Sequence, residues 1–422
     1  MATSYTSSTA NNRSPEPPRN PFFRRVFKAF SYHNYRLLWF GAFTSSIGTW
    51  MQQVAQSWLV FEMSKSPFLL GLDAFLGQLP IILFSLVGGV IADRMDRRRL
   101  LLASQYVQMG SAFLQVILIA TGWVQVWHIL ALSFVVGTAQ AFGGPAYQAL
   151  VPMLVEKEDL PNAIALNSIQ FNLARVVGPW LGGLAFEHIG PAWCFGLNGL
   201  SFLAVVSSLL ALRISFIPAA ASNSILASMR EGFRFIRSQG AMQGLLLIAF
   251  CMTLFAFPML TFFPVFAKDV FHGGPMVFTL LLSASGVGSV VGALIVATIG
   301  DIQRKGLIAL TSLAVLGTGI AAFALSRSLV LSTLLVFING GLLMMGFSMI
   351  TSLVQLITAN EMRGRVMSVY NVAFRGGMPI GSLMTGFLLK YFSAPAVIAV
   401  NGLLLLAVGL FYLTMKRKVA SL

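Results

Sequence analysis

The sequence contains few charged residues and almost no cysteine. Only 10% of its 422 residues are Asp, Glu, Lys or Arg, whereas 57% are hydrophobic, so a water-soluble fold would have too little polar surface to cover its core. Its two cysteines, Cys194 and Cys251, lie in apolar runs without His or acidic neighbours at ligand spacing. This argues against a disulfide framework and against a metal site. Because the sequence has no Walker loop or other enzyme motif, neither a cofactor nor catalysis is expected.

Long apolar runs are what the sequence has in abundance. About twelve stretches of roughly 18 or more residues follow one another, and each could cross about 30 Å of hydrocarbon as a helix. The runs are continuous rather than alternating, which favours helices over strands. The predicted fold class is an all-α membrane protein with about twelve transmembrane helices in two pseudo-symmetric six-helix bundles.

The basic residues are distributed unequally between the two sides of these spans. They give a net charge of +15 and form short clusters in both tails and every second loop, whereas the intervening loops carry only Lys65, Lys268, Arg327 and Lys390. The positive-inside rule therefore predicts a multi-pass protein of the plasma (inner) membrane with both termini in the cytoplasm. A nucleic-acid partner is not expected, because the basic residues form no separate domain.

Composition also divides the chain into segments. The start is rich in Ser, Thr, Asn and Pro, which is typical of disorder. Between spans six and seven, Met229, Phe233 and Ile236 repeat at helical spacing among arginines, which predicts an amphipathic helix on the membrane surface. The predicted segments are a disordered cytoplasmic tail at 1–33, a six-helix bundle at 34–213, this linker at 214–241, a second bundle at 242–415 and a tail at 416–422.

The two bundles share sequence features, which indicates an internal duplication. An Asp followed by basic residues comes after the second span, at Asp93, and after the eighth, at Asp301. An R-x-x-x-P pattern begins at Arg175 in span five and again at Arg375 in span eleven. Duplication of this kind is typical of secondary transporters, whose substrate site lies between the repeats.

The loop between spans two and three resembles the G-x-x-x-D-R-x-x-R-R signature of the major facilitator superfamily. Its glycine allows close helix approach, and its Asp suits the positive end of a neighbouring helix. A merely topogenic basic loop would explain the arginines but not the Asp. The resemblance implies a conformational latch against span eleven, carried by Gly89, Asp93, Arg94, Arg97, Arg98 and, in a second copy that departs from the pattern, Asp301.

Two further segments narrow the resemblance. Span five resembles the G-P-x-x-G-G signature of exporters, at Gly178, Pro179, Gly182 and Gly183, although glycines in a span are more often plain packing residues. The segment from Gly48 to Val60 resembles the branch that contains the enterobactin exporter and the transmembrane secretion effector proteins. This resemblance covers residues 34–415 and implies a proton-driven efflux carrier of unspecified cargo.

Polar groups inside the spans are candidates for cargo and proton sites, because they are costly in lipid. Four polar residues of span one recur at helical spacing and predict a stripe facing a central cavity. Arg175 lies near mid-depth, where contact with an anionic cargo group and structural hydrogen bonding are both open. The predicted cavity residues are Thr49, Gln52, Gln53, Gln56, Arg175, Asn198 and Asn339.

A proton-sensitive ion pair is predicted between Asp73 of span two and Arg375 of span eleven, because their depths are compatible and these spans are neighbours in the superfamily. The alternative is that Asp73 faces water and Arg375 bonds to carbonyl groups.

Together these features predict a monomeric secondary carrier that is not an enzyme. It would export an amphipathic or apolar small molecule, drug-like or siderophore-like, by alternating access, with protons as the coupling ion and membrane lipids as its surroundings. A lipid or lysophospholipid flippase of the same fold is the nearest alternative. A non-transporting scaffold or receptor is a more distant one, since it has no need of duplicated latch motifs.

Overall fold

The computed structural model describes residues 27–212, 225–299, 304–359 and 361–415. Six long helices form the N-terminal half: α2 (His33–Ser64), α3 (Pro67–Arg94), α4 (Arg97–Ala120), α5 (Val126–Leu150), α6 (Leu160–Ile189) and α7 (Pro191–Ala211). Six more form the C-terminal half: α9 (Gly240–Thr261), α11 (Pro275–Ile299), α12 (Lys305–Leu325), α13 (Leu329–Leu356), α14 (Arg363–Leu388) and α15 (Ala394–Thr414). The short elements are η1 (Lys28–Ser31), η2 (Val151–Met153), η3 (Lys157–Asp159), α8 (Ile225–Ser238), α10 (Phe263–Val265) and η4 (Phe266–Val270).

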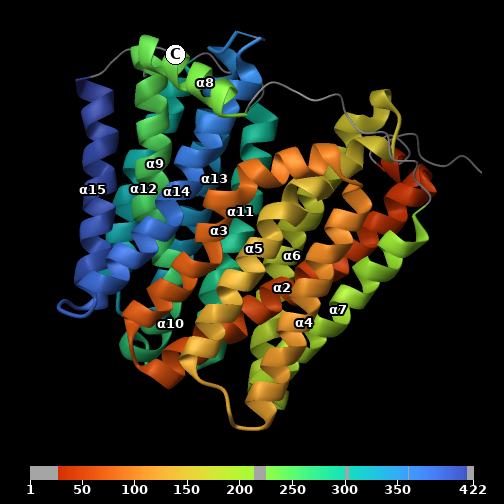
Figure 1. Cartoon of the computed structure of the whole chain (residues 1–422). Helices are drawn as coiled ribbons and strands as arrows, with labels where there is room; N and C mark the ends of the chain where they lie inside the picture. Colours follow the sequence, from red (N-terminus) through yellow and green to blue (C-terminus); the bar gives the residue numbers. More distant parts are fainter. Residues whose placement is uncertain (1–26, 213–224, 300–303, 360, 416–422) are drawn as a thin grey trace, which may run out of the picture.

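The two halves stand side by side and repeat the same packing (Figure 1). The pairs α3 with α5, α4 with α7 and α2 with α6 correspond to α11 with α13, α12 with α15 and α9 with α14. The halves meet along two further pairs, α3 with α14 and α6 with α11, which are equivalent under the same exchange. The fold is therefore the predicted pair of pseudo-symmetric six-helix bundles.

Nine of the twelve long helices in the described ranges are apolar enough by composition to cross a membrane. The other three, α2, α6 and α14, carry the polar stripe of span one, Arg175 and Arg375 in their interiors. The helices least compatible with lipid thus hold a large share of the predicted functional residues, although Asp73, Asn198 and Asn339 lie on three of the apolar ones.

Local sequence sets where several helices begin and end. Pro67 stands in the first turn of α3, where a missing N–H costs nothing. Asp96 caps α4, because its side chain accepts hydrogen bonds from the N–H groups of Arg98 at 2.9 Å and Arg99 at 3.4 Å. Gly190 ends α6 with a φ of 89°, a conformation that glycine adopts without strain.

Two ends of the molecule are distinguished below. The α8 end holds α8, η1 and η3, and the η4 end holds α10, η4 and the α6–α7 connection. At the α8 end, η1 is ordered and Ala29 is fully buried, with its N–H donating to Oδ1 of Asn162 at 2.9 Å. Residues 28–33, which were included in the predicted disordered tail at 1–33, are therefore structured, and residues 1–26 lie outside the described residues.

The amphipathic helix predicted in the 214–241 linker corresponds to α8, which lies across the C-terminal half in Figure 1. It docks there through an ion pair between Glu231 and Arg365 of α14 and through Ile236, which is buried. Phe233, by contrast, is 59% exposed. Phe233 and Ile236 therefore do not form one membrane-facing stripe as predicted, and the side chain of Met229 lies outside the described part of the chain.

Candidate functional site

Polar side chains in the interior of α2 bond to helices of its own half on two faces, one toward α7 and one toward α3 and α5. The Gln52 Oε1 atom accepts a hydrogen bond from Nδ2 of Asn198 on α7 at 2.6 Å. Gln56 bonds to α3 and α5. Gln52, Gln56 and Asn198 therefore serve contacts within the N-terminal half, so only part of the predicted stripe faces a central cavity.

The remaining polar positions of α2 lie on a different face. Gln53 is exposed and Thr49, half-buried, donates a hydrogen bond to the Ser45 carbonyl at 2.9 Å. At about 100° per residue, both lie between the face that meets α3 and α5 and the face that meets α6. Because α3 and α6 are the helices that touch the C-terminal half, this face of α2 looks toward that half.

Asp73 lies in a polar cluster inside the N-terminal half. It is only 4% exposed. Nε2 of Gln56 donates to its two carboxylate oxygens at 3.1 and 2.9 Å, and the hydroxyl of Ser133 on α5 donates to Oδ1. The cluster thus ties together α2, α3 and α5.

The predicted pair between Asp73 and Arg375 is not formed in this structure. The carboxylate of Asp73 is fully engaged by neutral donors of its own half, whereas Arg375 is exposed on α14. Two residues along a helix turn the side chain by roughly 200°, so Asp73 faces away from the side on which Gly71 of α3 meets α14.

Arg175 lies where α6, α2 and α11 come together. Its guanidinium carbon is 5.9 Å from the ring centre of Trp50 on α2, and that ring meets Phe171 edge-on at 6.0 Å. Its Nε atom is buried, and among the described residues it has no hydrogen-bond partner. A β-carbon added to Gly286 of α11 would stand 3.3 Å from the Arg175 carbonyl oxygen. Arg175 is therefore a cation beside the junction of the two halves.

The exporter-type glycines of α6 have two roles. A β-carbon at Gly178 would stand 2.5 Å from Cβ of Trp50, and one at Gly182 would stand 3.0 Å from Cα of Met51. Gly178 and Gly182, with buried Pro179, therefore bring α6 close to α2 within one half. A β-carbon at Gly183 would stand 2.6 Å from Oγ1 of Thr279 on α11, so Gly183 belongs to the contact between the halves.

The second contact between the halves is also lined by small residues. A β-carbon at Gly71 of α3 would stand 2.5 Å from the carbonyl oxygen of Ser382 and 3.3 Å from Cα of Gly386, both on α14. We call these two contacts, α3 with α14 and α6 with α11, the glycine seams. Gly71, Gly386 and Gly183 all lie toward the η4 end of their helices.

Charged contacts reinforce the closure of the η4 end. Glu62 at the end of α2 forms an ion pair with Lys268 of η4, which belongs to the other half. Lys390, just after α14, lies 3.7 Å from the ring centre of Phe68 on α3. The pairing of Glu62 with Lys268 was not predicted from the sequence. The available signal was that both stand near the end of the first span of their half.

The predicted latch residues lie near the α8 end, at the end of α3 and the start of α4. A β-carbon at Gly89 would meet no atom of the described residues within 4 Å, so the close helix approach predicted there is not formed among them in this conformation. Arg97 donates to the Ala149 carbonyl at 3.2 Å, and Arg98 donates to the carbonyl of Leu209 at 2.5 Å. These cations thus bind helix ends of α5 and α7 in their own half.

The other latch positions add little to this geometry. Arg94 is exposed at the end of α3, and the side chain of Asp93 and the whole of Asp301 lie outside the described residues.

In the C-terminal half, Asn339 is buried, and its Nδ2 atom lies 3.9 Å from the Met259 sulfur. Asn339 therefore packs inside its bundle and does not face the other half as predicted.

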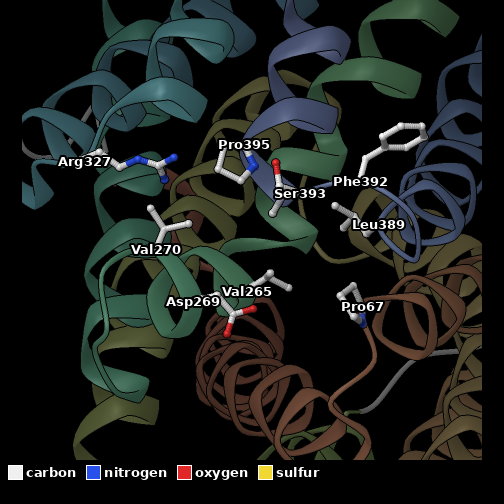
Figure 2. Close-up of a pocket in the computed structure, with 10 residues that line it drawn as sticks. Pro67, Val265, Asp269, Val270, Arg327, Leu389, Phe392, Ser393 and Pro395 are labelled. Carbon is white, nitrogen blue, oxygen red and sulfur yellow. The ribbon is translucent and has the colours of Figure 1, made fainter.

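A cavity of about 360 Å³ lies at the η4 end. Figure 2 shows Asp269 of η4 and Arg327 of the α12–α13 connection on its wall, with Pro67 of α3 on the other side. It is separate from the inward faces of α2 and α6. Among the described residues, no group of three or more His, Cys, Asp or Glu is placed to hold a metal ion.

Comparison with solved structures supports this architecture. The chain is similar to a bacterial homologue of the human lysosomal transporter Spinster in an inward-facing, occupied conformation, with a TM-score of 0.72 and 14% identity over 92% of this chain and 97% of that one. It is also similar to the nucleoside transporter NupG, with a TM-score of 0.69 and 13% identity over 91% of this chain and 99% of that one. At these identities the likeness concerns the fold alone.

Sequence relatives are efflux proteins. Macrolide efflux protein A of Streptococcus pyogenes is 24% identical over 84% of this chain and 90% of its own length. The enterobactin exporter EntS of Citrobacter koseri is 27% identical over 93% of this chain and 91% of its own length. The sequence pattern described as "transmembrane secretion effector" matches residues 25–421. Because that match spans nearly the whole chain, and the fold agrees with it, this protein belongs to the transmembrane secretion effector family of major facilitator transporters.

Proposed function

We propose that this chain is a monomeric, proton-coupled exporter of amphipathic small molecules, and that it works by alternating access. The observation that carries the proposal is the unequal contact between the halves. The glycine seams and the pair of Glu62 with Lys268 join them toward the η4 end, whereas a β-carbon at Gly89, near the α8 end of α3, would have no neighbour within 4 Å among the described residues. A carrier needs such a state and its opposite.

The charge distribution orients this state in the membrane. Arg94, Arg97, Arg98, Arg234 and Arg237 are among the basic residues at the α8 end, and the positive-inside rule assigns such an end to the cytoplasm. The structure is then the inward-facing state of a protein in the plasma membrane, with both termini in the cytoplasm. Cargo would enter from the cytoplasm between the halves.

Asp73 is the residue that we assign to proton coupling. Its carboxylate is buried inside the membrane-spanning region, where a charge is expensive, and it is held by the neutral donors Gln56 and Ser133. Gln56 lies on α2, one turn from Gln53, which faces the other half. Gain or loss of a proton at Asp73 would therefore rearrange hydrogen bonds among α2, α3 and α5.

Uptake into inverted vesicles with an imposed pH gradient tests the proposal. Enterobactin and a macrolide are the first cargoes to try, because relatives are named for them. We expect gradient-driven uptake by the unaltered protein, and at least a tenfold loss in Asp73→Asn, with cargo exchange in the absence of a gradient retained. Asp269→Asn, at an exposed carboxylate of η4, is the matched control. Full gradient-driven uptake by Asp73→Asn would contradict the proton role.

A further inference from the structure

We infer that the cargo is an amphipathic organic anion, whose anionic group is bound between Arg175 of α6 and Arg375 of α14 when the carrier is loaded. The inference rests on the proposed transport function and names the chemical class of its substrate. It follows from where the two arginines lie on α6 and α14 and from what surrounds them.

Arg175 marks the N-terminal side of this site. Its side chain extends beside Trp50 of α2, and its backbone lies against Gly286 of α11 in the other half. Ser283, one turn before Gly286, donates a hydrogen bond to the Val176 carbonyl at 3.4 Å. The arginine thus lies at the junction of the halves, close to mid-helix in α6.

Arg375 marks the C-terminal side. It precedes Ser382 by two helical turns and Gly386 by three, so it lies on the same side of α14 as the residues that touch α3. It is about 10 Å closer to the α8 end than Ser382, at 1.5 Å per residue. There its side chain is exposed.

Acidic partners for these two cations are scarce. The chain has 13 acidic residues. Only Asp73 lies deep inside a membrane-spanning helix, since every other one precedes the first of these helices, lies between two of them or stands within two residues of a helix end. Asp73 is engaged by Gln56 and Ser133. In the described part of the chain, neither arginine forms an ion pair or a hydrogen bond, and Nε of Arg175 is buried without a partner.

If Arg175 and Arg375 had a purely structural role, they would make different contacts. An arginine that stabilises a helix bundle in lipid pairs with a carboxylate or with backbone carbonyls, as Arg98 does with Leu209. Arg175 and Arg375 lack such contacts, although an unpaired cation at this depth is unfavourable. A ligand that carries the opposite charge would satisfy both guanidinium groups, and it would also bring the two halves together around it.

The surroundings indicate the rest of the ligand. A guanidinium binds carboxylate, sulfonate or phosphate oxygens with two parallel hydrogen bonds. Trp50 and Phe171 stand beside Arg175, while Phe374, next to Arg375, lies 4.7 Å from Phe347. These rings offer apolar surface to a hydrophobic or aromatic body. The fitting cargo therefore has one anionic group on a largely apolar frame.

Three pyrene probes with the same body test the charge preference: 1-pyrenebutyrate, the neutral 1-pyrenebutanol and a trimethylammonium analogue. Binding to the purified protein in nanodiscs is followed by fluorescence. We expect the anion to bind at least about tenfold more tightly than either other probe, because its charge enters a weakly screened site. Arg175→Gln and Arg375→Gln should each reduce this preference at least fivefold, whereas Arg175→Lys, which keeps the charge, should retain most of it.

Arg234→Gln, at an exposed arginine of α8, is the matched control and should leave the preference unchanged. Equal binding of the three probes, or a full preference in both glutamine variants, would overturn the inference. Binding of lysophosphatidylglycerol without binding of pyrenebutyrate would assign the site to a lipid and also overturn it. Because these are binding measurements, a protein that prefers the anion but moves no cargo refutes the transport proposal alone.

Discussion

Gly71 of α3 and Gly386 of α14 lie so close that a β-carbon added to either would stand 3.3 Å from the α-carbon of the other. At Gly71 the added atom would also stand 2.5 Å from the Ser382 carbonyl oxygen, closer than real side chains come to backbone. We therefore expect Gly71→Ala to push the η4 ends of the halves apart and to favour the state that is open there. Spin labels on α2 and η4, measured by double electron–electron resonance, would show a longer distance.

A glycine of the same helix provides the control for this change. A β-carbon at Gly77 would meet nothing within 4 Å, so Gly77→Ala should leave the distance distribution unchanged. If Gly71→Ala gives the same distances as the unaltered protein, the seam is not the contact that sets the closed state.

A larger side chain at Gly89 should disfavour the other state, the one that is closed at the α8 end. Because no atom lies within 4 Å of its β-carbon position, Gly89→Leu should fold with unchanged thermal stability. It would, however, block the approach of α14 when the α8 end closes, and vesicle transport should fall at least about tenfold, as expected for a barrier raised by 1.4 kcal/mol or more. Gly110→Leu on α4, equally unobstructed, should transport normally. Normal transport by Gly89→Leu would exclude a tight approach at this position.

The ion pair of Glu62 with Lys268 should contribute modestly to the closed state, since the two side chains are 44% and 31% exposed. Such partly solvated pairs contribute about 0.5–1 kcal/mol, so Glu62→Lys should shift the equilibrium between states by about two- to fivefold. The double variant Glu62→Lys with Lys268→Glu should restore it. The same distance measurement reports the result, and failure of the double variant to recover would argue against a direct pair.

The contact between η1 and η3 predicts a dependence of stability on pH. Lys28 and Tyr32 bind Asp159 at 2.7 and 2.8 Å, and their hydrogen bonds hold the pKa of the Asp159 carboxyl below its ordinary value of 3.8. A lowered pKa stabilises the folded state above the ordinary value and ceases to do so as the pH falls through the folded one. Asp159→Asn should therefore lower the melting temperature equally from pH 7 to pH 5, and the difference should shrink below about pH 4.

The second hydrogen-bond partner of Asp159 is the phenol of Tyr32. The bond to Asp159 raises the pKa of Tyr32 to about 12, so the phenol keeps its proton throughout that range. Tyr32→Phe should thus lose part of the stability with the same acid dependence. Thermal unfolding in detergent, followed by intrinsic fluorescence, measures both variants. A difference that stays constant down to pH 3 would show that the carboxylate charge is not what matters.

The helical layout and the family could be predicted from the sequence because both depend on local patterns. Continuous apolar runs fix the spans, and the motifs at Gly89 and Gly178 occur at short, fixed spacings. Pairing across helices was harder to predict. Spacing along a helix gives the depth of Asp73 but not which neighbour it faces, and the partners Gln56 and Ser133 come from helices whose rotation the sequence leaves open.

Because the sequence leaves the rotation and packing of the helices open, other contacts also differ from the prediction or were not predicted. Gln52 and Asn198 were assigned to a cavity because lipid excludes them, yet a helix contact within one bundle excludes lipid equally well. Glu62 and Lys268 are 206 residues apart, and only the packed halves bring them together. Buried amides and seam contacts therefore depend on the three-dimensional arrangement, whereas spans and motifs do not.

The smoothness of the glycine seams has a consequence for speed. Where Gly71 meets Gly386, the seam between α3 and α14 brings backbones together, so these two helices can part there without a rotamer having to change first. Separation also exposes little apolar area there, so the two states can lie close in free energy. In the proposed mechanism, a small input such as one proton or one cargo molecule would then be sufficient to reverse the balance, and turnover would be limited by binding rather than by friction between the bundles.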